Sequence, residues 1–142
     1  MSDEAKPKTA VEELAGILAA EAEAERLAEL ERPEKEARLE LDRRKTFREL
    51  KAKLGIDLQR IDTPAGMVAI KRVAADTAKQ FHVMALNPAQ HGEANTFITL
   101  AAVVYPDPDT FAAWVEKYPM MIGRLSHLVG DFAGSDVSAK KA

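Results

Sequence analysis

The chain lacks cysteine altogether, and this absence removes several classes of protein. Without a thiol there is no disulfide framework, no thiolate zinc site, no iron–sulfur cluster and no cysteine nucleophile. Long apolar runs are missing too, because no stretch approaches the roughly 18 apolar residues of a membrane span. The first residues are charged and contain no apolar signal segment. We therefore expect a cytoplasmic protein rather than a secreted or membrane-spanning one.

The chain also lacks a strong excess of either charge. Its 142 residues include 20 Lys and Arg and 23 Asp and Glu, so the net charge is -3. Such a balance offers no electrostatic reason to bind nucleic acid or an anionic membrane. A basic cluster at residues 43–53 is interleaved with acids, and we interpret it as a solvated helix face. We predict neither nucleic-acid nor membrane partners.

Recognisable catalytic and metal-binding motifs are absent as well. No phosphate-binding glycine loop and no nucleophile elbow occurs in the sequence. His82, His91 and His127 are far apart and lack metal-binding spacing. Asp107 and Asp109 stand among prolines, where helix capping explains them better than paired-carboxylate catalysis. We therefore predict a non-enzymatic protein that holds no metal and no cofactor.

Aromatic residues are few and unevenly placed. Seven of the eight Phe, Trp and Tyr residues lie after residue 56, while 26 of the first 56 residues are charged. Because large aromatic side chains supply much of the burial that a small core needs, we expect the core in the second part. The predicted organisation is a charged helical extension at residues 1–55, a helical core domain with a β-hairpin at 56–134, and a disordered tail at 135–142.

The extension is rich in Ala, Glu, Leu and Arg, which favour a helix. Thr9 and Glu12 have capping-box spacing at its start, and Pro33 suits the first turn of a new helix better than a helix interior. We therefore predict two helices divided at Pro33, the second ending at Gly55. A solvated charged helix is the favoured interpretation of this region. A partner-docking helix is the alternative, and a coiled coil is less favoured because no heptad pattern persists.

A short hairpin is predicted at residues 56–72. The Thr-Pro-Ala-Gly segment at 63–66 has good turn chemistry, since proline presets φ and glycine accepts a positive φ. The flanking segments are short and rich in β-branched residues, which favours strands. Helices are expected elsewhere, so the predicted fold class is mainly α. They run from about residue 76 to 87, from 93 to 104, from an Asp107 cap to Tyr118, and from Pro119 to a stop at Gly134.

Four segments of the second part form a pattern of their own. They are GMVAIKR at 66–72, a following helix with an aromatic residue, VVYPDPDTFAAWVEKYP at 103–119, and IGRLSHLVGDFAG at 122–134. This pattern resembles that of the tail assembly chaperones of long-tailed bacteriophages and related prophages, except that Val73-Ala74 replaces a frequent Pro-Thr step. The matching positions, mostly structural in that family, are Lys71, Arg72, Phe81, Tyr105, Pro106, Asp107, Phe111, Trp114, Tyr118 and Pro119.

The resemblance implies a non-catalytic function in the cytoplasm of a bacterial host. Members of the family bind the long tape-measure protein, help the tail-tube protein polymerise around it, and generally leave before the tail is complete. The tape-measure and tail-tube proteins are therefore the expected partners. Met120 and Met121, next to Tyr118, are a candidate contact surface because methionine adapts to varied partners. Core filling is the favoured interpretation of this methionine pair.

Two other functions stay open at this stage. A virion structural or head–tail adaptor protein would remain in the particle, where mass spectrometry of purified virions would find it. A small enzyme with an unrecognised site would show a ligand-dependent shift of its melting temperature.

Overall fold

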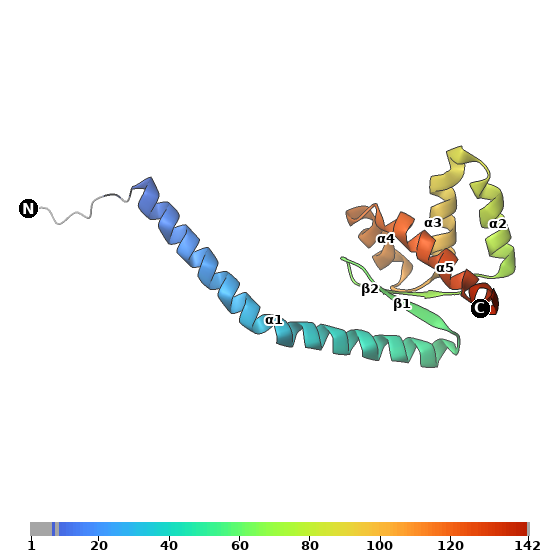
Figure 1. The fold of residues 1–142 in the computed structure, drawn as a ribbon, viewed down its shortest axis with the longest axis horizontal. Helices are drawn as coiled ribbons and strands as arrows, with labels where there is room; N and C mark the ends of the chain where they lie inside the picture. Colours follow the sequence, from blue (N-terminus) through green and yellow to red (C-terminus); the bar gives the residue numbers. More distant parts are fainter. Residues whose placement is uncertain (1–6, 8, 142) are drawn as a thin grey trace, which may run out of the picture. The chain divides into compact units, whose positions relative to one another are not determined.

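A computed structural model describes residue 7 and residues 9–141, with side chains described up to residue 134. Helices dominate this part of the chain, and three strands form one small antiparallel sheet, so the mainly α prediction with a hairpin is confirmed (Figure 1). The elements in chain order are α1 (Ala10–Leu54), β1 (Leu58–Asp62), β2 (Met67–Lys71), α2 (Ala75–Ala85), the 3-10 helix η1 (Pro88–Gln90), α3 (His91–Ala102), β3 (Val103–Tyr105), α4 (Pro108–Lys117) and α5 (Met121–Lys141).

The chain divides into two compact units, Met1–Arg44 and Lys45–Ala142. We predicted the division at residue 55, where the helical extension ends, whereas the structure places it inside α1. The last turns of α1 include the partly buried side chains of Phe47 and Leu50. These apolar residues lie in the part of α1 that belongs to the second unit.

The helix α1 is continuous, which corrects the prediction of two helices divided at Pro33. Its start agrees with the sequence, because the Glu12 amide donates to Thr9 Oγ1 at 3.1 Å and the Thr9 amide donates to Glu12 Oε2 at 3.4 Å. Proline inside a helix removes one backbone hydrogen bond and crowds the preceding turn. Strong helix formers on both sides outweigh that cost, and Figure 1 shows α1 bending in the part that contains Pro33.

The hairpin forms as predicted, with β1 and β2 antiparallel and Ile61 opposite Val68. Its turn is closed by backbone hydrogen bonds between Thr63 and Gly66, from the Thr63 amide at 2.9 Å and from the Gly66 amide at 3.1 Å. The Thr63 hydroxyl also donates to the Gly66 carbonyl at 2.7 Å. Gly66 has a φ of 156°, a conformation that side-chain-bearing residues rarely adopt. The turn therefore depends on threonine and glycine at its two ends.

A third strand, β3, was not predicted from the sequence. We expected a helix through residue 104, but α3 ends at Ala102 and β3 then pairs with β2, placing Ala69 opposite Tyr105. Tyr105 precedes Pro106, and the residue before a proline is disfavoured in helical geometry. Two valines and a tyrosine also suit a strand better than a helix end. As the central strand, β2 has its first four residues buried.

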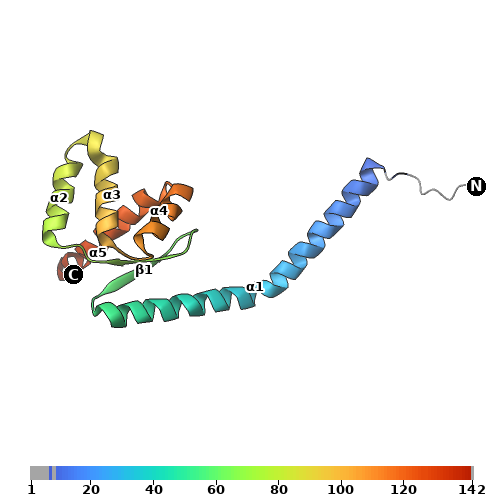
Figure 2. The same cartoon turned by 180° about the vertical axis from the view of Figure 1, so that it is seen from behind.

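The core of the second unit joins the sheet to three helices. Figures 1 and 2 show α2, α3, α4 and α5 gathered on one side of the sheet, and α3 packs against both α2 and α5. The buried residues that make up this core are Ile61, Val68, Ile70, Ile98, Ala102, Phe111, Met121, Leu125 and Val129.

The last helix, α5, continues past the stop predicted at Gly134 and reaches Lys141. Among the described glycines, a positive φ occurs at Gly55 and Gly66, so Gly134 does not take the left-handed conformation that ends a helix. The tail predicted as disordered at 135–142 is thus helical as far as Lys141, and Ala142 lies outside the described residues. Gly55, by contrast, has a φ of 65° and its amide donates to the Lys51 carbonyl at 2.9 Å, as expected of a helix stop.

Candidate functional site

The two basic residues of the family pattern, Lys71 and Arg72, have different surroundings. Lys71 is exposed at the end of β2. Arg72 donates to the Phe132 carbonyl at 3.2 Å and to Asp57 Oδ2 at 3.1 Å, and its guanidinium lies 4.4 Å from the centroid of the Phe132 ring. Arg72 therefore ties the segment before the hairpin to α5.

The aromatic positions of the pattern are buried to different degrees. Phe111 is 1% exposed and belongs to the core, whereas Phe81, Trp114 and Tyr118 are partly buried and pack against it. Phe81 of α2 also lines a pocket of about 290 Å³ facing α5. Tyr105 is partly buried in β3 and precedes Pro106, a buried residue that follows a cis peptide bond. Pro119, by contrast, is exposed in the link between α4 and α5.

Asp107 caps α4, with Pro108 in the first turn, as the sequence indicated. Its Oδ1 accepts a hydrogen bond from the Thr110 hydroxyl at 2.6 Å, and its Oδ2 accepts one from the Thr110 amide at 3.0 Å. These hydrogen bonds, the hydroxyl's first, lower the pKa of the Asp107 carboxyl from its ordinary value. The charged cap is favoured in the folded state.

We expect the Asp107 cap to make the stability of the protein depend on acid pH. A carboxyl whose pKa is lowered on folding stabilises the protein above its unfolded pKa, about 3.9, and loses that contribution as pH falls through its folded pKa. Asp107→Asn keeps a capping acceptor but does not titrate. The difference in melting temperature between the native protein and the Asn variant should therefore stay constant above about pH 5 and shrink as pH falls from there through about 3.9 and below. A difference between the two proteins that stays constant over that fall in pH would contradict the prediction.

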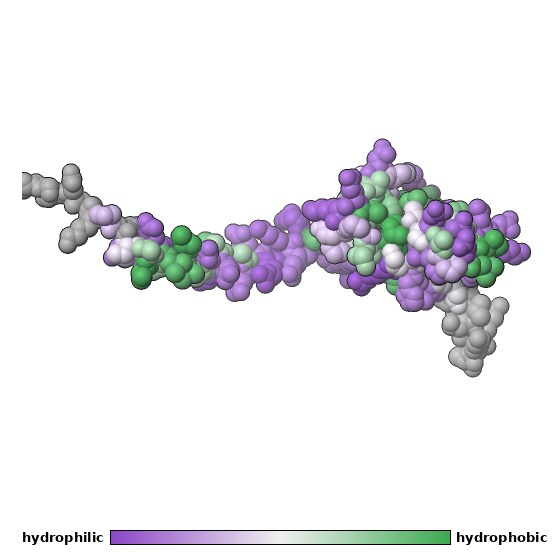
Figure 3. All heavy atoms as spheres, turned by 90° about the horizontal axis from the view of Figure 1, so that it is seen from above, coloured by the Kyte–Doolittle hydropathy of each residue, from purple (hydrophilic) through white to green (hydrophobic). Residues whose placement is uncertain are grey.

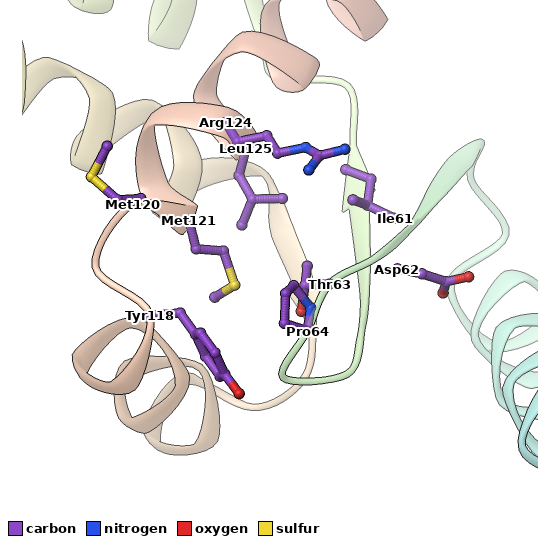
Figure 4. Close-up of a pocket in the computed structure, with 9 residues that line it drawn as sticks. All are labelled: Ile61, Asp62, Thr63, Pro64, Tyr118, Met120, Met121, Arg124 and Leu125. Atoms are coloured by element: carbon purple, nitrogen blue, oxygen red, sulfur yellow. The ribbon is translucent and has the colours of Figure 1, made fainter.

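An apolar pocket of about 200 Å³ lies where the hairpin turn meets the junction of α4 and α5. Figure 4 shows Met121 extending into the space between Tyr118 and Pro64, while Arg124 reaches across toward Ile61. The turn supplies one wall and the helix junction supplies the other. The residues that line the pocket are Ile61, Asp62, Thr63, Pro64, Tyr118, Met120, Met121, Arg124 and Leu125.

The two methionines differ in their surroundings, so core filling and partner contact have to be considered for each one separately. Met121 is 6% exposed and belongs to the core, so core filling is confirmed for it. Met120 is 87% exposed, and Figure 4 shows its side chain pointing away from Met121 at the rim of the pocket. Sequence reasoning had found Tyr118 and the methionines but missed Arg124 and Pro64, which come to the same pocket through the hairpin and the start of α5.

The pocket has the size of one or two side chains. Sites for small molecules usually enclose about 300–1,000 Å³, which is more than this pocket offers. Its lining is mainly apolar, with the Arg124 guanidinium near one wall and the Asp62 carboxylate on the hairpin side. Asp62 pairs with Arg60 at 2.9 Å. The arrangement suits the insertion of an apolar side chain from another protein.

Two further properties of the described residues bear on function. No group of three or more His, Cys, Asp or Glu residues there is arranged to hold a metal ion. Within the same residues, none of the helices has the length and apolar character that crossing a bilayer demands.

A separate apolar surface lies on α1. Figure 3 shows apolar side chains gathered toward the N-terminal end of this helix and hydrophilic ones along its middle. Val11 is 77% exposed there, and Leu14, Ile17 and Leu18 each leave more than half of their surface exposed. Among the described residues of the first unit, none covers this surface.

Comparison of the chain with protein-family models, with curated proteins and with solved structures finds no match in any of the three.

Proposed function

We propose that the chain is a tail assembly chaperone of a long-tailed bacteriophage or prophage, which binds the tape-measure and tail-tube proteins without catalysing a reaction. The proposal starts from the resemblance of residues 66–134 to that family. It is supported by the folding of all four resembling segments into a single compact unit. Of their aromatic residues, Phe111 belongs to the core that joins the sheet to the helices, and Phe81, Trp114 and Tyr118 pack against it.

The observation that carries the proposal is the apolar pocket between the hairpin turn and the α4–α5 junction. An amphipathic helix of a partner docks by placing apolar side chains into such a recess. Tyr118 and the exposed Met120 provide an adaptable apolar contact, because thioether and aromatic groups tolerate varied neighbours. Arg124 at the pocket edge favours an acidic residue beside the inserted side chain.

The proposal predicts genes for a tape-measure and a tail-tube protein beside the gene for this chain, and it is tested with their products. Purified full-length chain should bind segments of the tape-measure protein in isothermal titration calorimetry. Met120→Asp places a charge on the pocket rim and should weaken binding more than tenfold, or about 1.4 kcal/mol. Because Met120 is 87% exposed, this variant should fold normally.

A matched control separates the pocket from general surface effects. Val83→Asp places the same charge on α2, where Val83 is 67% exposed and does not line the pocket. It should leave the affinity within about twofold of the native value, an energy that corresponds to roughly 0.4 kcal/mol. Absence of binding to both proteins, or recovery of the chain from mature virions, would contradict the chaperone function. Recovery from virions would favour a structural or adaptor protein instead.

A further inference from the structure

The helix α1 has its acidic and basic residues at opposite ends. From Ala10 to Glu31 it carries seven acids and one base, whereas from Arg32 to Leu54 it carries nine bases and five acids. One continuous helix cannot bring its own two ends together. Ion pairs within the helix, such as Arg26–Glu23 at 2.7 Å and Arg44–Glu40 at 2.9 Å, compensate only part of the charge at each end. A second copy of α1 contains a complementary segment for each end.

An exposed apolar seam crosses the point where the charge changes sign. Leu27, Leu30 and Leu41 are 47%, 68% and 51% exposed, although each is a large apolar side chain. Steps of alternately three and four residues lead from Leu27 to Leu41, which places these positions on one helix face. Ala37 also lies on this face, and Glu34 occupies the remaining position. The seam extends over about two heptads, too short to appear as a sustained heptad pattern in the sequence.

We propose that two copies of the chain pair their α1 helices antiparallel through the seam formed by Leu27, Leu30, Ala37 and Leu41. In antiparallel packing, each a position of one helix faces a d position of the other. Leu30 and Leu41 occupy these two kinds of position, so Leu30 of each copy lies against Leu41 of the other. The same register faces Glu23 of each copy with Arg48 of the second copy. A two-fold axis produces both contacts twice, as is usual in dimers of identical chains.

The charge distribution selects the antiparallel orientation over the parallel one. A parallel pair in register would place the acidic segment from Ala10 to Glu31 beside the same acidic segment of the other copy. Like charges at such a distance oppose pairing, whereas opposite charges at the flanks of a seam specify orientation. Glu34 lies within the seam, and its carboxylate is 3.3 Å from the Arg38 guanidinium of the same helix, which compensates its charge.

This proposal is independent of the chaperone function, because the seam belongs to the long helix and the pocket belongs to the second unit. Either one can fail without the other. The seam is tested in the full-length chain by cross-linking, which the absence of native cysteine makes simple. Two single variants are prepared, Leu30→Cys and Leu41→Cys, one of them with a mass tag, and they are mixed and oxidised.

Antiparallel pairing should give disulfides between the two different variants, with few disulfides between two copies of the same variant. Leu39→Cys is the control, since Leu39 is also exposed, at 50%, but lies on another face of α1. Its cross-links with Leu30→Cys report random collision and should be several-fold fewer. Predominance of links between identical variants would show a parallel pair, and yields equal to the Leu39 control would show no seam. Either result overturns the proposal.

Sedimentation of the native chain provides a second measurement. We expect a monomer–dimer equilibrium with a dissociation constant below about 100 μM, an affinity appropriate to a short seam. The dimer should be lost in a variant that combines Leu30→Asn and Leu41→Asn, and it should weaken as salt screens the flanking charges. An unchanged thermal unfolding curve, followed by Trp114 fluorescence, would show that the second unit is intact in that variant. A native chain that still sediments as a monomer at about 100 μM overturns the proposal.

Discussion

Replacing Phe111 with alanine is expected to lower the free energy of unfolding by about 3–5 kcal/mol. Phe111 is 1% exposed and is the largest of the fully buried side chains. It anchors α4 in the core that also contains Val68 and Leu125. Removing the ring deletes apolar contacts and leaves a cavity that close-packed neighbours fill only in part. Denaturant unfolding followed by circular dichroism measures the change.

The control for this experiment is Leu100→Ala in α3. Leu100 is 56% exposed, so the same kind of truncation there removes little buried surface. It should change the free energy of unfolding by less than about 0.5 kcal/mol, because exposed helix positions away from special contacts tolerate substitution. Equal effects of the two substitutions would show that Phe111 does not anchor the core.

Replacing Gly66 with alanine should destabilise the protein by about 1–3 kcal/mol through a collision with Trp114. A Cβ atom at residue 66 would lie 2.6 Å from Cη2 and 3.0 Å from Cζ2 of the indole ring. The φ of 156° at Gly66 is also unfavourable for alanine. Because Trp114 is the one tryptophan in the chain, its fluorescence spectrum reports whether the ring has moved.

Gly92→Ala is the matched control, since a Cβ atom there meets open space at the start of α3. Alanine has the higher helix propensity, so this variant should be as stable as the native protein or more stable. A double variant, Gly66→Ala with Trp114→Leu, tests the mechanism directly. If the ring collision is the cause, the double variant loses less than the sum of the two single losses. Additive losses would assign the effect of Gly66→Ala to the backbone alone.

The partial burial of Trp114 limits the expected cost of truncating it. A fully buried tryptophan costs about 3–5 kcal/mol when truncated to alanine. Trp114 lies between the hairpin turn and the core and keeps part of its surface in solvent. Truncation of Trp114 should therefore cost less than truncation of Phe111.

Local features of the fold were predictable because their causes are local. The capping box of Thr9 and Glu12, the Asp107 cap, the glycine stop at Gly55 and the turn at 63–66 each depend on a few neighbouring residues. In each case the side chain or the permitted φ that forms the structure belongs to the same short segment. Sequence reasoning needs no knowledge of the rest of the chain for such features.

Features that balance local against distant contributions were predicted less well. Pro33 was expected to end a helix, but strong helix formers and ion pairs on both sides, such as Glu31–Lys35 at 3.2 Å, carry α1 past it. The segment at 103–105 was expected to be helical, but pairing with β2 makes it a strand. Neither outcome follows from the propensity of one residue, because a chain-wide sum or a distant partner decides it.

The sequence by itself determined that the protein is mainly helical, with a hairpin, a charged extension and an aromatic-rich core, because periodicity, turn chemistry and composition are local properties. Only the tertiary structure decided that the hairpin turn closes one side of a pocket whose other side is the α4–α5 junction. It also decided that Met121 is buried while its neighbour Met120 is exposed, and that Gly66 lies against Trp114. Contacts between residues that are far apart in the chain depend on how whole elements pack, and no short segment of sequence contains that information.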